Sequence, residues 1–426
     1  MNTSHHPEMP DTRIPSDLRR AFEHAAEDAG LPLPILPQTD DLFRRFADHY
    51  LPLRALPRRA RRALERRWAR SVGTLALLLA LAQAPAWAAT IPVDGIGCTL
   101  VEAITAANSD SPVGGCTAGS GADTIVLPAG STHTLISRLP DTTDGDDRYF
   151  RRLGYAGLPL VTSPITIEGN GSTVRRENGA PDDFRVFTVG RPPGQLTLRN
   201  TTVSGGRLQG ISGFDPDVQG GGLLVYEGVA VLENSTVTGN TAGVGGGISS
   251  RGGALFLTDS TISSNTAYAV LFGGAGGLSS DASLDSYAYL RMHNSTISGN
   301  YTRDDGGGLT TRGSSTALIT NSVIVENYAR ESCGGMATGS DVSFAASTVT
   351  VTNSTIAGNT AAGAGASFRS AGGGLCNYHS PLTIVNTTVS HNVVSGLSPS
   401  GGGINNRYGA PPDADQHDCF FQSLRR

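Results

Sequence analysis

Lysine is absent from this sequence: all 32 basic side chains are arginine, and charged residues make up only 16% of the 426. Average soluble domains carry about 25% charged residues, so the composition does not fit an ordinary globule with a charged shell. The formal net charge of −5 gives no reason to expect a nucleic-acid partner. The glycine-rich segments lack the Lys-Ser/Thr pair of a phosphate-binding loop, and no nucleophile motif is evident. We therefore expect no cofactor.

A long hydrophobic run is also missing. The apolar segment at 72–82 is shorter than the ~20 residues that span a bilayer core. It follows an arginine-rich stretch and precedes Ala86-Trp87-Ala88, which fits a cleavage site of small residues. We predict a signal peptide at 66–88 that is removed after Ala88, with a permanent signal anchor as the alternative. The rest of the chain is then extracellular or on the bacterial outer surface, and it meets the membrane only through this segment.

Residues 1–65 contain amphipathic, arginine-rich segments, which predict a short helical extension. Two interpretations stay open. The extension is a module at the cytoplasmic or membrane surface, or the start codon is assigned too far upstream and translation begins near Leu64.

Glycine, by contrast, is abundant, at 55 of 426 residues, or about 13% against about 7% in average proteins. A heptad also recurs: NSTVTGN at 234–240 returns as NSTISGN at 294–300 and NSTIAGN at 353–359. Seven residues share its first position: Asn200, Asn234, Asp259, Asn294, Asn321, Asn353 and Asn386. Six share its last position: Asn240, Asn265, Asn300, Asn327, Asn359 and Asn392. A Val or Ile lies midway in every copy.

The first positions are spaced by 34, 25, 35, 27, 32 and 33 residues. Periods of 20–50 residues are typical of solenoids and propellers, but a propeller blade needs about 40 residues. Thr, Ser, Val, Gly and Asn dominate the period and are poor helix formers, and an alternating segment precedes each heptad. Three short strands per period predict an all-β fold, a right-handed parallel β-helix at 161–408.

Stacking of the coils explains the repeated asparagines. Strands of successive coils lie about 4.8 Å apart, so equivalent residues lie over one another. We expect the Val/Ile residues to form an aliphatic core. We expect the first asparagine of each heptad to form a structural amide ladder, at Asn200, Asn234, Asn294, Asn321, Asn353 and Asn386. Asparagine also tolerates the left-handed backbone of a sharp turn.

A cap is predicted at 89–160, where a stacked sheet needs its first edge covered. Thr99 and Glu102 form a capping box, and the apolar residues after Thr99 fall on one face of a short helix. Cys98 and Cys116 bracket this helix in an exported segment, so we predict that they form a disulfide. We do not predict a Cys333–Cys376 pair, because the two cysteines occupy different positions of the repeat.

These segments also support a resemblance. CTLVEAITAAN, GADTIVLPAG and SPITIEGNGSTVRR resemble the CSLREA-type N-terminal domain of exported bacterial β-helix proteins, with CTLVEA in place of the six signature residues. The GGGI and NSTISGN blocks are similar to the GGA(I/L/V) and FxxN repeats of polymorphic outer membrane proteins, although Val or Ile replaces the Phe. The resemblance covers residues 97–404. It implies export and a β-helix, and it implies no particular activity.

An active site would need clustered acids. Pectate-lyase-like enzymes share the expected fold and place Asp with Arg or Lys on one face, and Asp304, Glu326 and Arg330 are candidates to converge in this way. Neighbouring charges on a solvated turn are the simpler interpretation of these residues and of Arg303, Asp305 and Glu331. His293, His379 and His391 lack regular spacing, so no metal site is predicted. We name no catalytic residue.

Two classes of function remain. The first is a surface adhesin or structural stalk that binds a partner along its solenoid face. The second is a polysaccharide lyase or glycoside hydrolase on the same scaffold. An acidic pair and a basic residue lining one groove would favour the enzyme, whereas an uninterrupted Thr/Ser/Asn surface would favour the adhesin. We favour the first class, with a surface glycan or another protein as the partner.

The repeat stops at the tail, 409–426. Its codons permit a reading in another frame that restores a strand and half a heptad, Thr-Leu-Thr-Asn-Thr-Thr-Val-Phe. We expect a frameshift here, Cys419 as its artefact, and a poorly ordered tail.

Overall fold

The computed structural model describes residues 88–140, 153–210, 216–268, 274–282, 286–339, 346–363, 372–395, 401–407 and 421–422, all within one compact unit, Pro85–Arg426. The predicted extension at 1–65, the signal segment before Ala88 and almost all of the tail at 409–426 lie outside the described residues.

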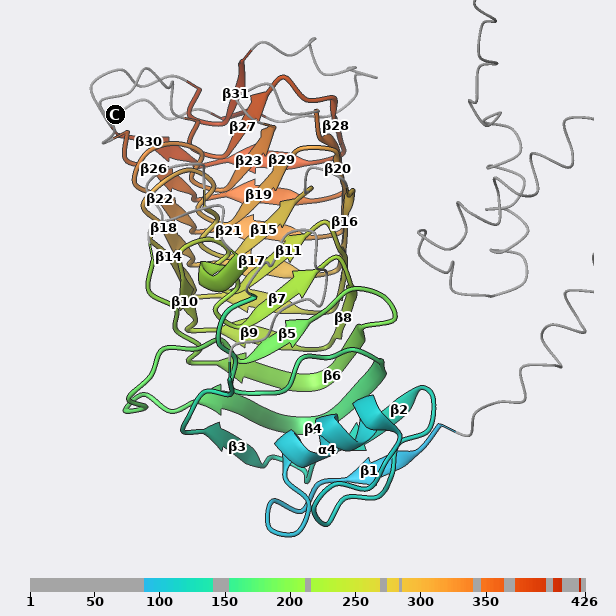
Figure 1. The fold of residues 1–426 in the computed structure, drawn as a ribbon. Coiled ribbons are helices and arrows are strands. Elements are labelled where there is room, and N and C mark those ends of the chain that lie inside the picture. The colour runs from blue at the N-terminus through green and yellow to red at the C-terminus, as the bar shows by residue number, and fades with distance from the viewer. Residues whose placement is uncertain are drawn as a thin grey trace, which may run out of the picture. The chain divides into compact units, whose positions relative to one another are not determined.

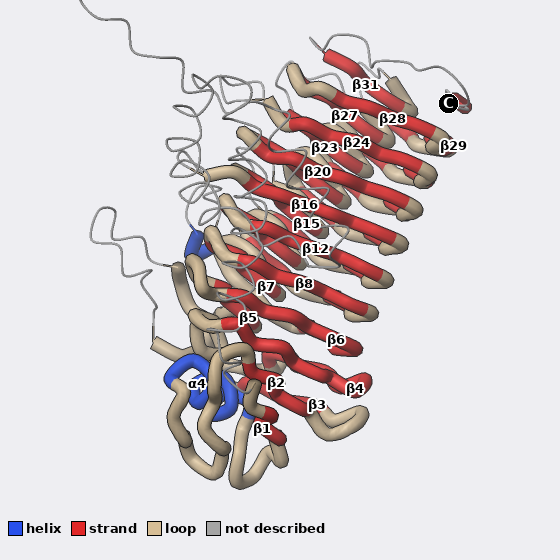
Figure 2. The backbone as a smooth tube through the Cα atoms, turned by 90° about the vertical axis from the view of Figure 1, so that its right-hand side faces the viewer, coloured by secondary structure: helices blue, strands red, loops and turns tan. Residues whose placement is uncertain are grey.

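Three parallel sheets run along the described part of the chain, and every named strand pairs with strands of neighbouring coils (Figures 1 and 2). The eight-stranded sheet contains β5 (Phe187–Val189), β7 (Leu223–Tyr226), β11 (Ile248–Arg251), β15 (Leu278–Asp281), β19 (Leu309–Arg312), β23 (Met336–Gly339), β27 (Leu375–Tyr378) and β31 (Ile404–Arg407). The six-stranded sheet contains β10 (Thr241–Ala242), β14 (Thr266–Ala267), β18 (Tyr301–Thr302), β22 (Tyr328–Ala329), β26 (Thr360–Ala361) and β30 (Val393–Val394).

The 18-stranded sheet holds the remaining strands. They are β1 (Thr90–Pro92), β2 (Asp123–Val126), β3 (Thr132–Leu135), β4 (Pro164–Arg176), β6 (Gln195–Ser204), β8 (Val229–Glu233), β9 (Thr236–Thr238), β12 (Ala254–Thr258), β13 (Thr261–Ser263), β16 (Ala288–His293), β17 (Thr296–Ser298), β20 (Ser315–Thr320), β21 (Val323–Val325), β24 (Thr348–Thr352), β25 (Thr355–Ala357), β28 (Leu382–Val385), β29 (Thr388–Ser390) and β32 (Phe421–Gln422). One coil, such as β11 to β14, contributes strands first to the eight-stranded sheet, then to the 18-stranded sheet and then to the six-stranded sheet. The predicted all-β parallel β-helix is confirmed.

The α-helix of the described residues, α4 (Leu100–Ser109), lies against β1 and β2 at the first coils (Figure 1). It begins with the capping box of Thr99 and Glu102, whose side chain accepts a hydrogen bond from the Thr99 backbone N–H at 2.9 Å. Its buried face includes Leu100 and Ile104. A disulfide joins Cys98 to Cys116 and fastens the helix to the following loop. A short 3-10 turn occurs at Pro216–Val218.

The heptads lie in register. Ile262 of β13 pairs with Val237 and Ile297 of the neighbouring coils, and all three side chains are fully buried. The core therefore contains the aliphatic column that the repeat predicted. Burying a Val, Leu or Ile side chain contributes about 1.5–3 kcal/mol, so each added coil contributes through this column as well as through its backbone hydrogen bonds.

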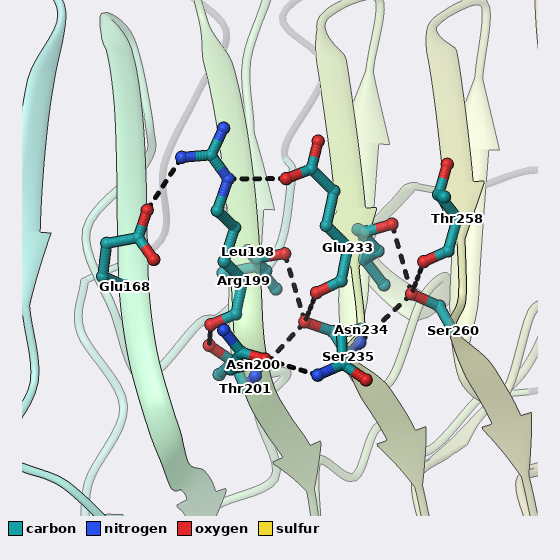
Figure 3. Close-up of polar contacts among 11 residues, drawn as sticks. Glu168, Leu198, Arg199, Asn200, Thr201, Glu233, Asn234, Ser235, Thr258 and Ser260 are labelled. Atoms are coloured by element: carbon teal, nitrogen blue, oxygen red, sulfur yellow. Dashed lines mark hydrogen bonds and ion pairs between the residues drawn. The ribbon is translucent and has the colours of Figure 1, made fainter.

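The first asparagine column lies in a bend. All seven of its residues have a positive φ, between 46° and 51°, and the side chains of Asn200, Asn234 and Asn294 are exposed. Side-chain bonds along the column join Asn234 to Asn200 and Asn294 to Asp259 (Figure 3 shows the first). Among the described residues, no such bond continues through Asn321, Asn353 and Asn386, so the expected continuous ladder is not in this column.

The continuous amide ladder lies in the second column, six residues later. The Nδ2 groups of Asn240, Asn265, Asn300, Asn327 and Asn359 each donate to Oδ1 of the asparagine in the next coil, over 2.9–3.0 Å. The same oxygen also accepts the backbone N–H of the preceding coil's asparagine. All six residues of the column are at most 1% exposed. This ladder satisfies buried bend amides that would otherwise lack partners.

A third column, directly after the first asparagine, forms a hydroxyl ladder. Ser235 shows the pattern: its Oγ donates to the carbonyl of Glu233 at 2.9 Å and accepts the backbone N–H of Thr201 at 3.2 Å (Figure 3). Ser260, Ser295, Ser322, Ser354 and Thr387 repeat it. The heptad therefore encodes a three-residue strand between two bends, each closed by its own ladder.

A second disulfide, which the sequence did not lead us to expect, joins Cys333 to Cys376 with Cα atoms 5.3 Å apart. Cys333 lies three positions before the inward apolar residue of its coil, Met336, whereas Cys376 lies one position after the corresponding residue of the next coil, Leu375. The chain bends at the first of these positions, where Cys333 has a φ of 60°, and this brings the two positions together. A Cβ placed on Gly372, the counterpart of Cys333, would lie 2.9 Å from Cys376 Sγ.

Candidate functional site

The outer side of the six-stranded sheet carries a group of exposed aromatic and basic side chains. Its strands are two residues long, and the second residue of most of them points inward and is fully buried. The first residue therefore faces outward. In β18 and β22 these outward residues are Tyr301 and Tyr328, which pair in register. Their rings stack with centroids 5.5 Å apart and planes 7° apart.

Two positions further along, the same face continues with Tyr268, Arg303 and Arg330. Their backbone N–H groups extend the sheet, donating to the carbonyls of Ala242, Ala267 and Thr302 respectively. We call the surface of Tyr268, Tyr301, Arg303, Tyr328 and Arg330 the Tyr–Arg face.

Both arginines of the Tyr–Arg face are exposed, and within the described segments neither makes an ion pair. The guanidinium carbon of Arg303 lies 5.1 Å from the ring centroid of Tyr268, within range of a cation–π interaction. Tyr268 is 40% and Tyr328 is 37% exposed. The face therefore presents aromatic rings and guanidinium donors together.

An acidic group follows the arginines in the sequence. Oxygens of Asp304, Asp305 and Glu331 lie within 4.8 Å of one another. Asp304 is 2% and Asp305 is 4% exposed, and Asp305 Oδ1 accepts the backbone N–H of Ser332 at 3.0 Å. Carboxylate oxygens suit a hard divalent cation, but Ca²⁺ takes six to eight oxygens, and this group supplies a carboxylate from three residues.

The candidate trio of Asp304, Glu326 and Arg330 does not come together as one acidic and basic group. Asp304 lies with Asp305 and Glu331, whereas Glu326 occupies an exposed bend with a φ of 56°. The histidines occupy different places: His293 Nδ1 lies 3.0 Å from Thr320 Oγ1, while His379 and His391 are bend residues with positive φ. The described residues thus bring together an acidic group and a Tyr–Arg face, and no combined acid–base pair with a histidine.

A shallow polar hollow of about 300 Å³ also lies along the first asparagine column, lined by Asn170, Gly171, Asn200, Thr201, Thr202, Asn234 and Thr236. Beside it Arg199 bridges Glu168 and Glu233, at 2.8 Å and 2.5 Å (Figure 3). These two hydrogen-bonded carboxylates raise the pKa of the Arg199 guanidinium. The triad ties three coils together and leaves none of its charges unpaired.

The Tyr–Arg face was not singled out from the sequence, although the signal was present. Counted from the first asparagine of a heptad, Tyr301 and Tyr328 are at position +7, and Arg303, Arg330 and Tyr268 are at position +9. Aligning those two columns, as was done for the asparagines, would have found the face.

The family model described as "right handed beta helix region" matches residues 190–409, more than half of the chain. The chain therefore belongs to this family of right-handed β-helix proteins. Comparison with curated proteins found no match, and comparison with solved structures found none either. A search of the described residues found no helix both long and apolar enough to cross a membrane.

Proposed function

We propose that this protein is an exported, non-catalytic binding solenoid, an adhesin or stalk on the cell surface or in the medium, that contacts its partner through the Tyr–Arg face. The observation that carries the proposal is the exposure, beside three tyrosines, of two arginines that make no ion pair with any residue the structure describes. Tyrosine and arginine are enriched where proteins bind partners. The signal-like segment at 66–88 and the resemblance to CSLREA-type and polymorphic outer membrane repeats support export.

A glycan is the partner that this face favours. The row that contains Tyr301 and Tyr328 also carries Thr241, Thr266 and Thr360, and it ends at Val393, so threonine hydroxyls flank the phenols. Tyr and Arg are also enriched in protein–protein interfaces, but the core of such an interface is more apolar than this row of phenols and threonines. Phenols, threonine hydroxyls and guanidinium N–H groups instead match the hydroxyls and ring oxygens of sugars.

The alternative is a polysaccharide lyase or glycoside hydrolase. Such an enzyme needs carboxylates that reach its substrate, and Asp304 and Asp305 are nearly fully buried. This burial supports binding without catalysis.

A glycan array probed with the full exported chain tests the proposal. Wild type is expected to bind a subset of glycans, and a Tyr301→Ala/Tyr328→Ala variant is expected to lose at least about tenfold in affinity. A Thr296→Ala/Thr355→Ala variant changes outward threonines of the 18-stranded sheet, away from the Tyr–Arg face, and is the matched control, expected to bind as wild type does. Absence of binding to any glycan, or equal binding by the tyrosine variant, would refute the proposed site. Product release from the same glycans would instead establish the enzyme.

A further inference from the structure

One column of polar side chains points into the core of the β-helix. In β11, Ile248 faces the core, so Ser250, two residues later, faces the same way. Strand pairing places Ser250 over Val225 of the preceding coil, and Val225 belongs to the aliphatic core. In later coils the column continues with Ser280, Thr311, Thr338 and Asn377.

Each member of this column has an oxygen that is buried and makes no hydrogen bond with any described residue: Ser250 Oγ, Ser280 Oγ, Thr311 Oγ1, Thr338 Oγ1 and Asn377 Oδ1. All five residues are at most 1% exposed. A buried oxygen or hydroxyl without a partner is rare in native proteins. Five in one column therefore require an explanation.

The neighbouring corner of the coil is polar as well. Ser315, Ser347 and Ser380 form a second buried column at the entrance to the 18-stranded sheet. Ser315 Oγ donates to Ser347 Oγ at 2.9 Å, and Ser347 Oγ donates to the carbonyl of Gly313 at 3.1 Å.

An earlier coil shows that each corner residue lies next to the inward residue of the coil before it. A Cβ placed on Gly253 would lie 2.8 Å from Val225 Cγ1 of the coil before it. In the same register Ser315 lies above Ser280, and Ser347 lies above Thr311. The corner residue is Gly253, Ala288 or a serine in these coils, and each of these side chains is small.

We propose that this corner, from Ser250 to Ser380, holds a single file of internal water molecules, one between each successive pair of inward hydroxyls. Stacked oxygens about 4.8 Å apart are too far for a direct bond. A water about 2.8 Å from both joins them at an angle of roughly 120°, close to tetrahedral. The serines of the corner column supply further partners, and an ordered buried water typically makes about three hydrogen bonds.

The direction in which a substitution shifts the urea midpoint tests whether the file of water molecules is present. In a dry corner, Thr311→Val replaces an orphaned hydroxyl with a methyl group of similar size and raises the urea midpoint. In a hydrated corner, the same change deprives waters of a partner, so we expect the midpoint to fall. Thr310→Val is the control, because the Thr310 hydroxyl already has a partner at 2.8 Å in Ser279 Oγ, and its midpoint is expected to fall in either case.

A crystal structure of the full chain at about 1.5 Å gives an independent readout. Ordered density between the hydroxyls of Ser280, Thr311 and Thr338 is expected. A raised midpoint for Thr311→Val, or a corner without density between these hydroxyls, would overturn the proposal.

Discussion

Replacing Asn300 with Ala tests which asparagine column holds the coils together. The Asn300 side chain makes four buried hydrogen bonds: Nδ2 donates to the Ile262 carbonyl and to Asn327 Oδ1, and Oδ1 accepts from the backbone and side-chain N–H groups of Asn265. Asn327 Oδ1 keeps the bond from the backbone N–H of residue 300. The substitution therefore leaves three buried groups without that partner.

Each buried group that loses its partner costs about 1–3 kcal/mol, so the free energy of unfolding is expected to fall by about 3 kcal/mol or more. The matched control is Asn321→Ala, which changes an exposed asparagine in the first column. Its φ of 51° is strained for alanine, and a left-handed alanine costs about 1 kcal/mol.

Urea denaturation followed by circular dichroism compares the two variants, and hydrogen exchange locates the change. Because each coil contacts only its neighbours, faster exchange is expected at Asn265 and in the adjoining bends. Equal losses for Asn300→Ala and Asn321→Ala would refute the assignment of the ladder to the second column.

Three further outcomes follow from the structure. Cys376→Ala opens a 43-residue loop closed by the bond to Cys333 and is expected to lower stability by about 4 kcal/mol, measured against wild type without reductant. Burial raises the pKa of Asp281, although Arg312 opposes the shift. The folded chain therefore binds this proton more tightly than the unfolded chain, and the free energy of unfolding falls as pH rises through the raised pKa. Relative to wild type, Asp281→Asn is expected to be more stable at pH 7 than at pH 4, and the reverse order in thermal melts would contradict this. Arg199→Met breaks an exposed ion triad and is expected to lose less than about 1 kcal/mol, with the loss shrinking in 1 M salt.

The coil architecture could be predicted from the sequence because every coil has the same structural requirements. A Val or Ile must fill the core, and small polar residues must turn the bends. The ladder was assigned to the wrong column because both asparagines recur with the same period, and a period does not distinguish a buried bend from an exposed one. Asp259 is the clue: a carboxylate in the first column has no N–H to donate, whereas all six residues of the second column are asparagine.

The unexpected disulfide and the Tyr–Arg face were missed for a different reason. Cys333 and Cys376 meet because a left-handed bend folds one repeat position over another, and that contact depends on backbone angles that residue types alone do not give. The Tyr–Arg face is built from residues that appear in only two or three coils. Comparing all coils equally draws attention to positions that never change, whereas a binding surface is made where a few coils differ.

The amide ladder also gives the solenoid an electrical direction. From Asn265 to Asn359 each carboxamide oxygen faces the coil before it, and one N–H of the same group faces the coil after it. The group dipoles are therefore aligned head to tail along the axis, as peptide dipoles are in an α-helix. Because the oxygens face the preceding coils, the negative end of this axial dipole lies toward the capping helix and the positive end toward the last coils. Hydrogen bonds in such a chain also polarise one another.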